Sequence, residues 1–193
     1  MILKERFNCL RQEGPACSAY MTAELLQHYD IYVDPKKIYD ILPRFIDKEA
    51  VHPKDVCRFI NTALAIKDID RQYSVYKGCS IEDIERQLNT GCPVPVMILY
   101  DRESHTWDDL HYVLITGITK NAVYMIDTLH KSSKRQRYKD HSTKDKHYNR
   151  IVKIEDFLLM WGLCNTPVFS KMLHIRNIMF MEKPYKMKNF MEN

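Results

Sequence analysis

The chain has 193 residues, the length of one ordinary domain, which is enough to bury a core without disulfides or metals. It is 45% hydrophobic and 28% charged, as expected for a globular protein, and apolar runs such as Val94–Tyr100 are too short to cross a bilayer. The net charge of +4 is modest and comes largely from residues 131–150, so it does not argue for nucleic-acid binding. We therefore expect a single domain over residues 1–193, with no membrane span.

The cysteines and the N-terminal residues bound the chemistry and the location. Six scattered cysteines without a CxxC pair fit neither a zinc site nor a small disulfide scaffold, so we expect reduced thiols. The sequence has no glycine-rich phosphate loop, HExxH motif or metal-spaced cluster, which predicts no cofactor and no bound metal. Residues 1–7 lack the apolar core and cleavage site of a signal peptide. This indicates a cytoplasmic protein, or an effector secreted without a recognisable signal peptide.

The first half of the chain is predicted to be mainly helical. Apolar spacing and proline or glycine stops predict helices from Cys17 to about Tyr29, from Pro35 to Leu42 and from Pro53 to about Ile66. Tyr73–Lys77 alternates like a strand. Ser80–Asp83 resembles a capping box that opens a further helix.

The second half is rich in β-branched and aromatic residues. We expect strands at Val94–Tyr100, Tyr112–Ile118 and Val123–Asp127, the last two joined by a short hairpin turn. Residues 131–150 form a long polar run, most simply a solvated loop, although a role facing the substrate or an acidic partner stays open. After this run we expect elements that close the fold: a strand at Ile151–Ile154, a helix at Ile154–Trp161 and a strand at Asn177–Glu182. Helices followed by antiparallel strands predict an α+β fold, with an N-terminal helical layer packed on a C-terminal antiparallel sheet.

Cys17 lies at the predicted start of the first helix, because Gly14 and Pro15 just before it cannot continue the helix backwards. Unpaired N–H groups and the positive end of the helix dipole favour the thiolate there, which is the nucleophilic form of cysteine. Gln12, on the incoming loop, can offer its side-chain amide to an oxyanion. A buried structural cysteine is the alternative.

His111 and Asp127 are the partners that the sequence offers to Cys17. His111 begins one predicted strand and Asp127 ends the next, so antiparallel pairing through a short turn brings the two side chains to the same rim of the sheet. Asp127 would then orient the imidazole while its other nitrogen takes the thiol proton. Taken singly, each residue could instead be structural, and His105, in a polar loop nearby, is the best substitute base.

Several stretches in this order resemble the peptidase C39-like branch of the papain-like cysteine proteases. They are Gln12 and Cys17 ahead of a helix, then Gly91–Val96, His111–Gly117 and Ile126–Thr128. The resemblance covers roughly residues 10 to 182. It implies that Cys17 is the nucleophile, His111 the general base and acid, Asp127 the orienting residue and Gln12 the oxyanion donor. The chain differs from the family pattern at Ser18, often glycine, at Thr128, often proline, and in a Gln-to-Cys step one residue shorter.

Three function classes follow from these observations. One is a papain-like cysteine protease that hydrolyses a peptide or isopeptide bond of a protein or peptide substrate through a thioester acyl-enzyme. Another is a glutamine deamidase or acyltransferase effector that uses the same triad. The third is a non-catalytic protein-binding module on the same fold. We expect such a module to have lost a triad residue, and this chain has Cys17, His111 and Asp127.

Overall fold

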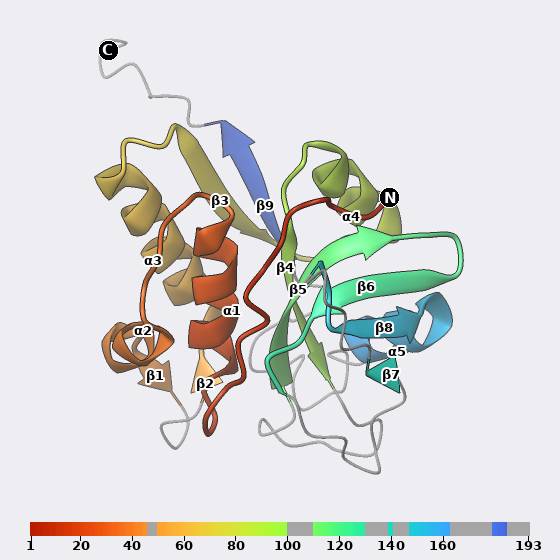
Figure 1. Ribbon diagram of the computed structural model, residues 1–193, viewed down its shortest axis with the longest axis horizontal. Helices are drawn as coiled ribbons and strands as arrows, with labels where there is room; N and C mark the ends of the chain where they lie inside the picture. Colours follow the sequence, from red (N-terminus) through yellow and green to blue (C-terminus); the bar gives the residue numbers. More distant parts are fainter. Residues whose placement is uncertain (46–49, 100–109, 130–138, 141–146, 163–178, 185–193) are drawn as a thin grey trace.

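A seven-stranded antiparallel sheet forms the centre of the computed structural model, which describes residues 1–45, 50–99, 110–129, 139–140, 147–162 and 179–184 (Figure 1). The strands follow the order β3-β9-β4-β5-β6-β8-β7. Their bounds are β3 (Arg71–Tyr76), β4 (Val94–Leu99), β5 (Leu110–Ile118), β6 (Ala122–Ile126), β7 (Lys139–Asp140), β8 (Arg150–Lys153) and β9 (Met179–Pro184). Every pairing is antiparallel. Strands β4, β5 and β6 are neighbours both in the sheet and along the described chain.

Helices cover both faces of this sheet. The first face carries α1 (Cys17–Gln27), α2 (Pro35–Ile41) and α3 (Pro53–Ile66), and the second carries α4 (Ile81–Asn89) and α5 (Ile154–Gly162). The small pair β1 (Arg44–Phe45) and β2 (Ala50–Val51) lies beside α2 in Figure 1. The predicted α+β fold with its N-terminal helical layer is confirmed, and α4 and α5 add a layer on the opposite face.

Side-chain alternation along the central strands explains how two cores share one sheet. In β4, Val96 and Ile98 face the core of α4 and α5, while Met97 and Leu99 face the core of α1 and α3. Strand β5 alternates in the same way and is buried along almost its whole length. A strand that is covered on both faces must be apolar at successive positions, which is why these strands read as continuous apolar runs.

Residues 1–12 form an arm that joins the sheet to α1. Ile2 bridges Gly117 of β5, and Leu3 donates its N–H to the Thr116 carbonyl at 2.8 Å. Gly117 is required at this approach, since a Cβ there would lie 2.8 Å from the Ile2 side chain. The arm then crosses towards α1, as the red segment of Figure 1 shows, and Gln12 donates its N–H to the Thr128 carbonyl at 2.9 Å. The arm therefore delivers the Gln12 loop to the end of β6.

The polar run at residues 131–150 is predicted to be a solvated loop, and its described residues differ from this in part. Lys139 and Asp140 form β7, and both Asn149 and Arg150 are buried, because Arg150 opens β8 and pairs with Met125 of β6. Residues 131–138 and 141–146 of this run lie outside the described residues, as does His105. No helix in the described part of the chain is both long and apolar enough to cross a membrane.

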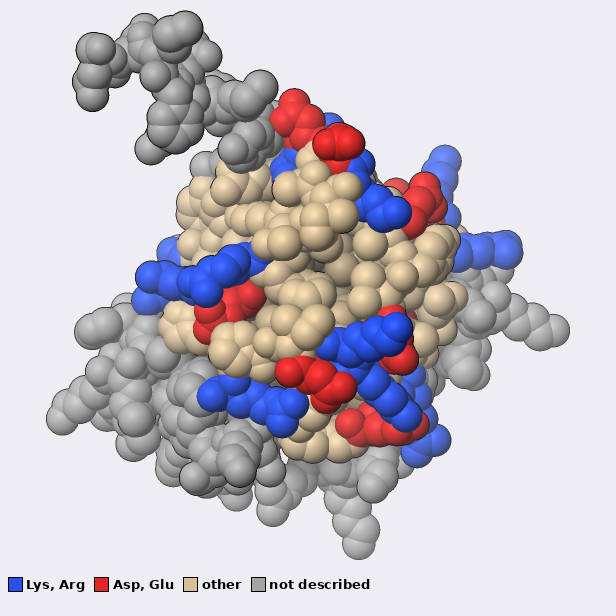
Figure 2. Space-filling view, turned by 90° about the vertical axis from the view of Figure 1, so that its left-hand side faces the viewer, with Lys and Arg blue, Asp and Glu red and all other residues tan. Residues whose placement is uncertain are grey.

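Charges of both signs are spread over the face formed by α2 and α3. Figure 2 shows Lys and Arg interspersed with Asp and Glu around a hollowed centre of uncharged residues. Two ion pairs belong to these helices: Lys36 lies 3.0 Å from Glu13, and Arg58 lies 3.3 Å from Asp55. Among the described residues, this face therefore mixes the two signs of charge.

Candidate active site

Cys17 is the first residue of α1, as the sequence predicts. Gly14 turns the chain ahead of it with φ +65°, and the Ala16 N–H donates to the Gly14 carbonyl at 3.0 Å. The residues that follow, Ser18 to Leu26, are all buried, which is typical of a helix enclosed by its domain. Because α1 packs against β5, the partly exposed thiol lies at a fixed helix N-terminus beside the start of that strand.

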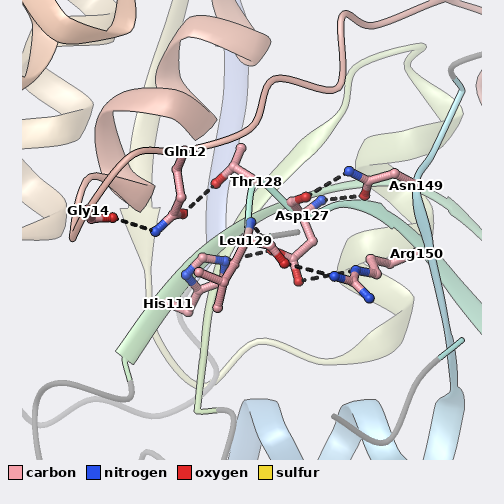
Figure 3. Close-up of polar contacts among 8 residues, drawn as sticks. All are labelled: Gln12, Gly14, His111, Asp127, Thr128, Leu129, Asn149 and Arg150. Atoms are coloured by element: carbon pink, nitrogen blue, oxygen red, sulfur yellow. Dashed lines mark hydrogen bonds and ion pairs between the residues drawn. The ribbon is translucent and has the colours of Figure 1, made fainter. Parts of the chain in front are cut away.

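His111 and Asp127 meet, as the hairpin predicts. His111 is the second residue of β5 and Asp127 directly follows β6, and the His111 Nε2 lies 2.9 Å from the Asp127 Oδ1 (Figure 3). His111 is only 4% exposed and Asp127 is fully buried, so the pair is more enclosed than the predicted position at the rim of the sheet. A buried charge-assisted hydrogen bond of this kind fixes both the ring orientation and its tautomer.

The thiol and the imidazole interact electrostatically. Burial opposes ionisation of Cys17 and by itself would raise the pKa of the thiol. The hydrogen bond and charge of His111, together with the backbone N–H groups of Tyr112 and Ser18, outweigh burial. They lower the pKa of the thiol from its ordinary 9.0. Burial likewise opposes protonation of His111, yet Asp127 and then Cys17 raise the pKa of the imidazole to about 10. Both shifts favour the thiolate–imidazolium pair over the neutral thiol and imidazole. Since Asp127 uses Nε2, the ring nitrogen left for Cys17 is Nδ1.

Asp127 is itself held from several sides. The Asn149 carboxamide binds its backbone twice, donating to the carbonyl at 2.7 Å and accepting from the N–H at 2.7 Å. The Leu129 N–H donates to Oδ1 at 2.8 Å. Arg150 places its Nε 3.8 Å from Oδ2 and donates from a terminal nitrogen to the Leu129 carbonyl at 2.8 Å (Figure 3). These contacts fix the backbone and the side-chain rotamer of Asp127, and they place a cation beside its second carboxylate oxygen.

The sequence interpretation missed Asn149 and Arg150, because they end a strongly polar run. One signal could have found them. A strand at Ile151–Ile154 that pairs antiparallel with the strand ending at Asp127 must begin beside that end, and the observed pairing of Met125 with Arg150 does this. The position of Asn149 and Arg150 beside Asp127 could thus have been predicted from the pairing of these two strands.

Gln12 lies on the other side of Asp127 and is tied to Thr128. The Thr128 hydroxyl donates to the Gln12 Oε1 at 2.7 Å, and the Gln12 Nε2 donates to the Gly14 carbonyl at 2.9 Å (Figure 3). A carbonyl only accepts, so the amide nitrogen must face Gly14 and the amide oxygen must face Thr128. The Gln12 amide is thereby oriented with its donor side towards the loop that leads to Cys17.

Over the described residues, no group of three or more His, Cys, Asp or Glu side chains is arranged to hold a metal ion. The polar side chains around Asp127 belong to one hydrogen-bonded network. The sequence model of the Peptidase C39 like family matches residues 4–155 of this chain. The matched span contains Gln12, Cys17, His111, Asp127 and Arg150. The chain belongs to this family. The predicted resemblance to C39-like peptidases is thus confirmed.

Solved structures share the fold of this C39-like domain. A protein from Bacillus anthracis described as a C39-like peptidase has 15% identity and a TM-score of 0.62, covering 96% of this chain and 98% of its own. The peptidase domain of Streptococcus ComA, a bifunctional ABC transporter, has 11% identity and a TM-score of 0.55, covering 91% and 96%. A double glycine motif protease from an AMS/PCAT transporter, in complex with the leader peptide, has 12% identity and a TM-score of 0.53, covering 94% of each. A search of curated proteins found no significant match.

Proposed function

We propose that this C39-like domain is a papain-like cysteine peptidase that hydrolyses a peptide or isopeptide bond. The observation that carries the proposal is that one imidazole, His111, interacts with a thiol at a helix N-terminus and lies 2.9 Å from a fully buried carboxylate. Cys17 is the nucleophile, His111 the general base and acid, and Asp127 the residue that orients the ring. Family membership supports the same chemistry.

The reaction starts from the thiolate–imidazolium pair. The Cys17 sulfur attacks the carbonyl carbon of the scissile bond and forms a tetrahedral intermediate. The protonated Nδ1 of His111 then gives its proton to the leaving amine, the C–N bond breaks, and a thioester remains on Cys17. A water molecule attacks the thioester while His111 takes its proton. The C–S bond then breaks, and release of the carboxylic acid leaves Cys17 as the thiolate and His111 as the imidazolium, the pair from which the reaction started.

We assign Gln12 and the Cys17 backbone N–H to the oxyanion. The Gln12 amide is fixed by Thr128 and Gly14, and an amide nitrogen has two hydrogens, of which the bond to Gly14 uses one. A donor that is already oriented before the reaction stabilises the developing charge without reorganisation, which is the main requirement of an oxyanion site. The hydroxyl of Thr128 supplies the orientation at the position where the family often has proline.

The substrate in this proposal is a protein or peptide. A structural neighbour of the same fold was solved in complex with a leader peptide, and Cys17 is half-buried, not fully enclosed, at the start of α1; both support a peptide substrate.

The test is product analysis on a mixed peptide library with mass spectrometry. The proposal expects new amino termini, no ammonia release, and a trapped adduct on Cys17 with a peptide aldehyde. Cys17→Ala should lose the activity, and Cys9→Ser, which removes another partly exposed thiol, should keep it. Ammonia release without cleavage would replace the peptidase by a glutamine deamidase. If the folded protein gave neither product, that result would contradict hydrolase activity on these peptides.

A further inference from the structure

Arg150 is the most enclosed cation described near the site. It opens β8, is 1% exposed, and ranks among the largest fully buried side chains. Removing a guanidinium from water is costly unless a partner offsets the charge. The partner that the geometry offers is Asp127, whose Oδ2 lies 3.8 Å from the Arg150 Nε.

The two oxygens of Asp127 face different cations. Oδ1 lies 2.9 Å from His111 Nε2 and accepts the Leu129 N–H, whereas Oδ2 faces Arg150. Arg150 also donates to the Leu129 carbonyl at 2.8 Å, so it contacts both the charge and the backbone of the segment that follows β6 (Figure 3). The carboxylate is therefore bracketed by the imidazole on one side and the guanidinium on the other.

We propose that Arg150 is a positioning residue of the active site, which balances the charge of Asp127 so that the buried site stays electrically neutral when Cys17 gives its proton to His111. This inference rests on the peptidase function proposed above. It adds a fourth charged group, from β8, to the three residues that the sequence predicts.

The charges of the site support this role. The titratable or charged side chains described here come from each neighbouring element: Cys17 from α1, His111 from β5, Asp127 after β6 and Arg150 from β8. The thiolate–imidazolium state holds two negative and two positive groups. The neutral thiol–imidazole state holds one of each. Without Arg150 both states would carry one uncompensated negative charge, which disfavours a further anion at Cys17.

The test is the pH dependence of Cys17 alkylation by iodoacetamide, read by peptide mapping, so it needs no substrate. Arg150→Met should move the midpoint of this profile upwards by about one pH unit, because loss of a nearby cation disfavours the thiolate. Arg150→Lys retains a cation and should stay near the wild-type midpoint. Lys153→Met removes an exposed cation from the same strand and should change nothing. With a cleavable peptide, Arg150→Met should lower kcat more than it changes KM.

A double variant keeps the inference testable if Arg150→Met does not fold. In an Asp127→Asn background the charge of Arg150 is in excess, and adding Arg150→Met removes that cation, so the midpoint of the double variant should lie above the midpoint of Asp127→Asn alone. A double variant with the same midpoint as Asp127→Asn, or a wild-type midpoint in folded Arg150→Met, would overturn the role of Arg150. Wild-type Cys17 that reacts no faster than Cys9 would instead overturn the peptidase proposal itself.

Discussion

The two sides of the Cys17–His111 pair differ in chemistry. On one side, Asp127, Asn149 and Arg150 are buried and include opposite charges. On the other, Gln12 is half-buried and is held by neutral hydrogen bonds to Thr128 and Gly14. Under the proposed function the two sides have different tasks: the enclosed ionic side sets the protonation of the imidazole, and the more open neutral side meets the substrate carbonyl. Mutations on the two sides should therefore affect different observables.

The largest effect should come from the pair between the two sides. Cys17→Ala or His111→Ala removes the nucleophile or the proton carrier, and either should lower kcat by on the order of 10⁴-fold or more. Combining them should add little, because the two residues act as one unit. Steady-state kinetics with circular dichroism measures this. If either single variant folds and retains near-normal turnover, the residue that it replaces is not catalytic.

Asp127→Ala tests the enclosed ionic side. The rate should fall on the order of 10³-fold, less than for loss of His111, because the base remains but its orientation is lost. Stability should fall as well, by about 3 kcal/mol, since Arg150 is left buried without its carboxylate. Urea denaturation beside kinetics measures both. If rate and stability match wild type, Asp127 only terminates the strand.

Gln12→Ala tests the open side. The rate should fall by on the order of 10²-fold with little change in KM, because a hydrogen bond to the oxyanion strengthens only in the transition state. Alkylation of Cys17 develops no oxyanion and should keep its rate, and the melting temperature should hardly change. A parallel fall in turnover and alkylation would show that the loop, and not the oxyanion, was disturbed.

Thr128→Val should give the smallest effect. It retains the shape of the side chain but loses the hydroxyl that orients the Gln12 amide, and we expect a rate loss of about tenfold from a misaligned donor. In a Gln12→Ala background the same substitution should add nothing further, which a double-mutant cycle measures. Additive losses would mean that Thr128 acts independently of Gln12.

The sequence allowed prediction of the residues whose positions follow from local patterns. Cys17 lies at a helix start signalled by Gly14 and Pro15, and His111 and Asp127 lie at strand ends joined by a short turn. Asn149 and Arg150 were missed, because the burial of a charged residue depends on a partner from another strand and not on its polar neighbours in the chain. The bond between Thr128 and Gln12 joins residues 116 positions apart, and no local pattern encodes it.

Labelling of the intact protein with iodoacetamide at neutral pH, followed by mapping of the modified cysteines, tests the central claim most directly. His111 and the helix N-terminus lower the pKa of Cys17, whereas burial raises the pKa of Cys57 to about 11. Cys17 should therefore react well before Cys57 and before the half-buried Cys9, and its reactivity should persist to a lower pH than that of an ordinary cysteine. His111→Ala should remove this advantage. Equal labelling of Cys9 and Cys17, unchanged in His111→Ala, would contradict the thiolate–imidazolium pair.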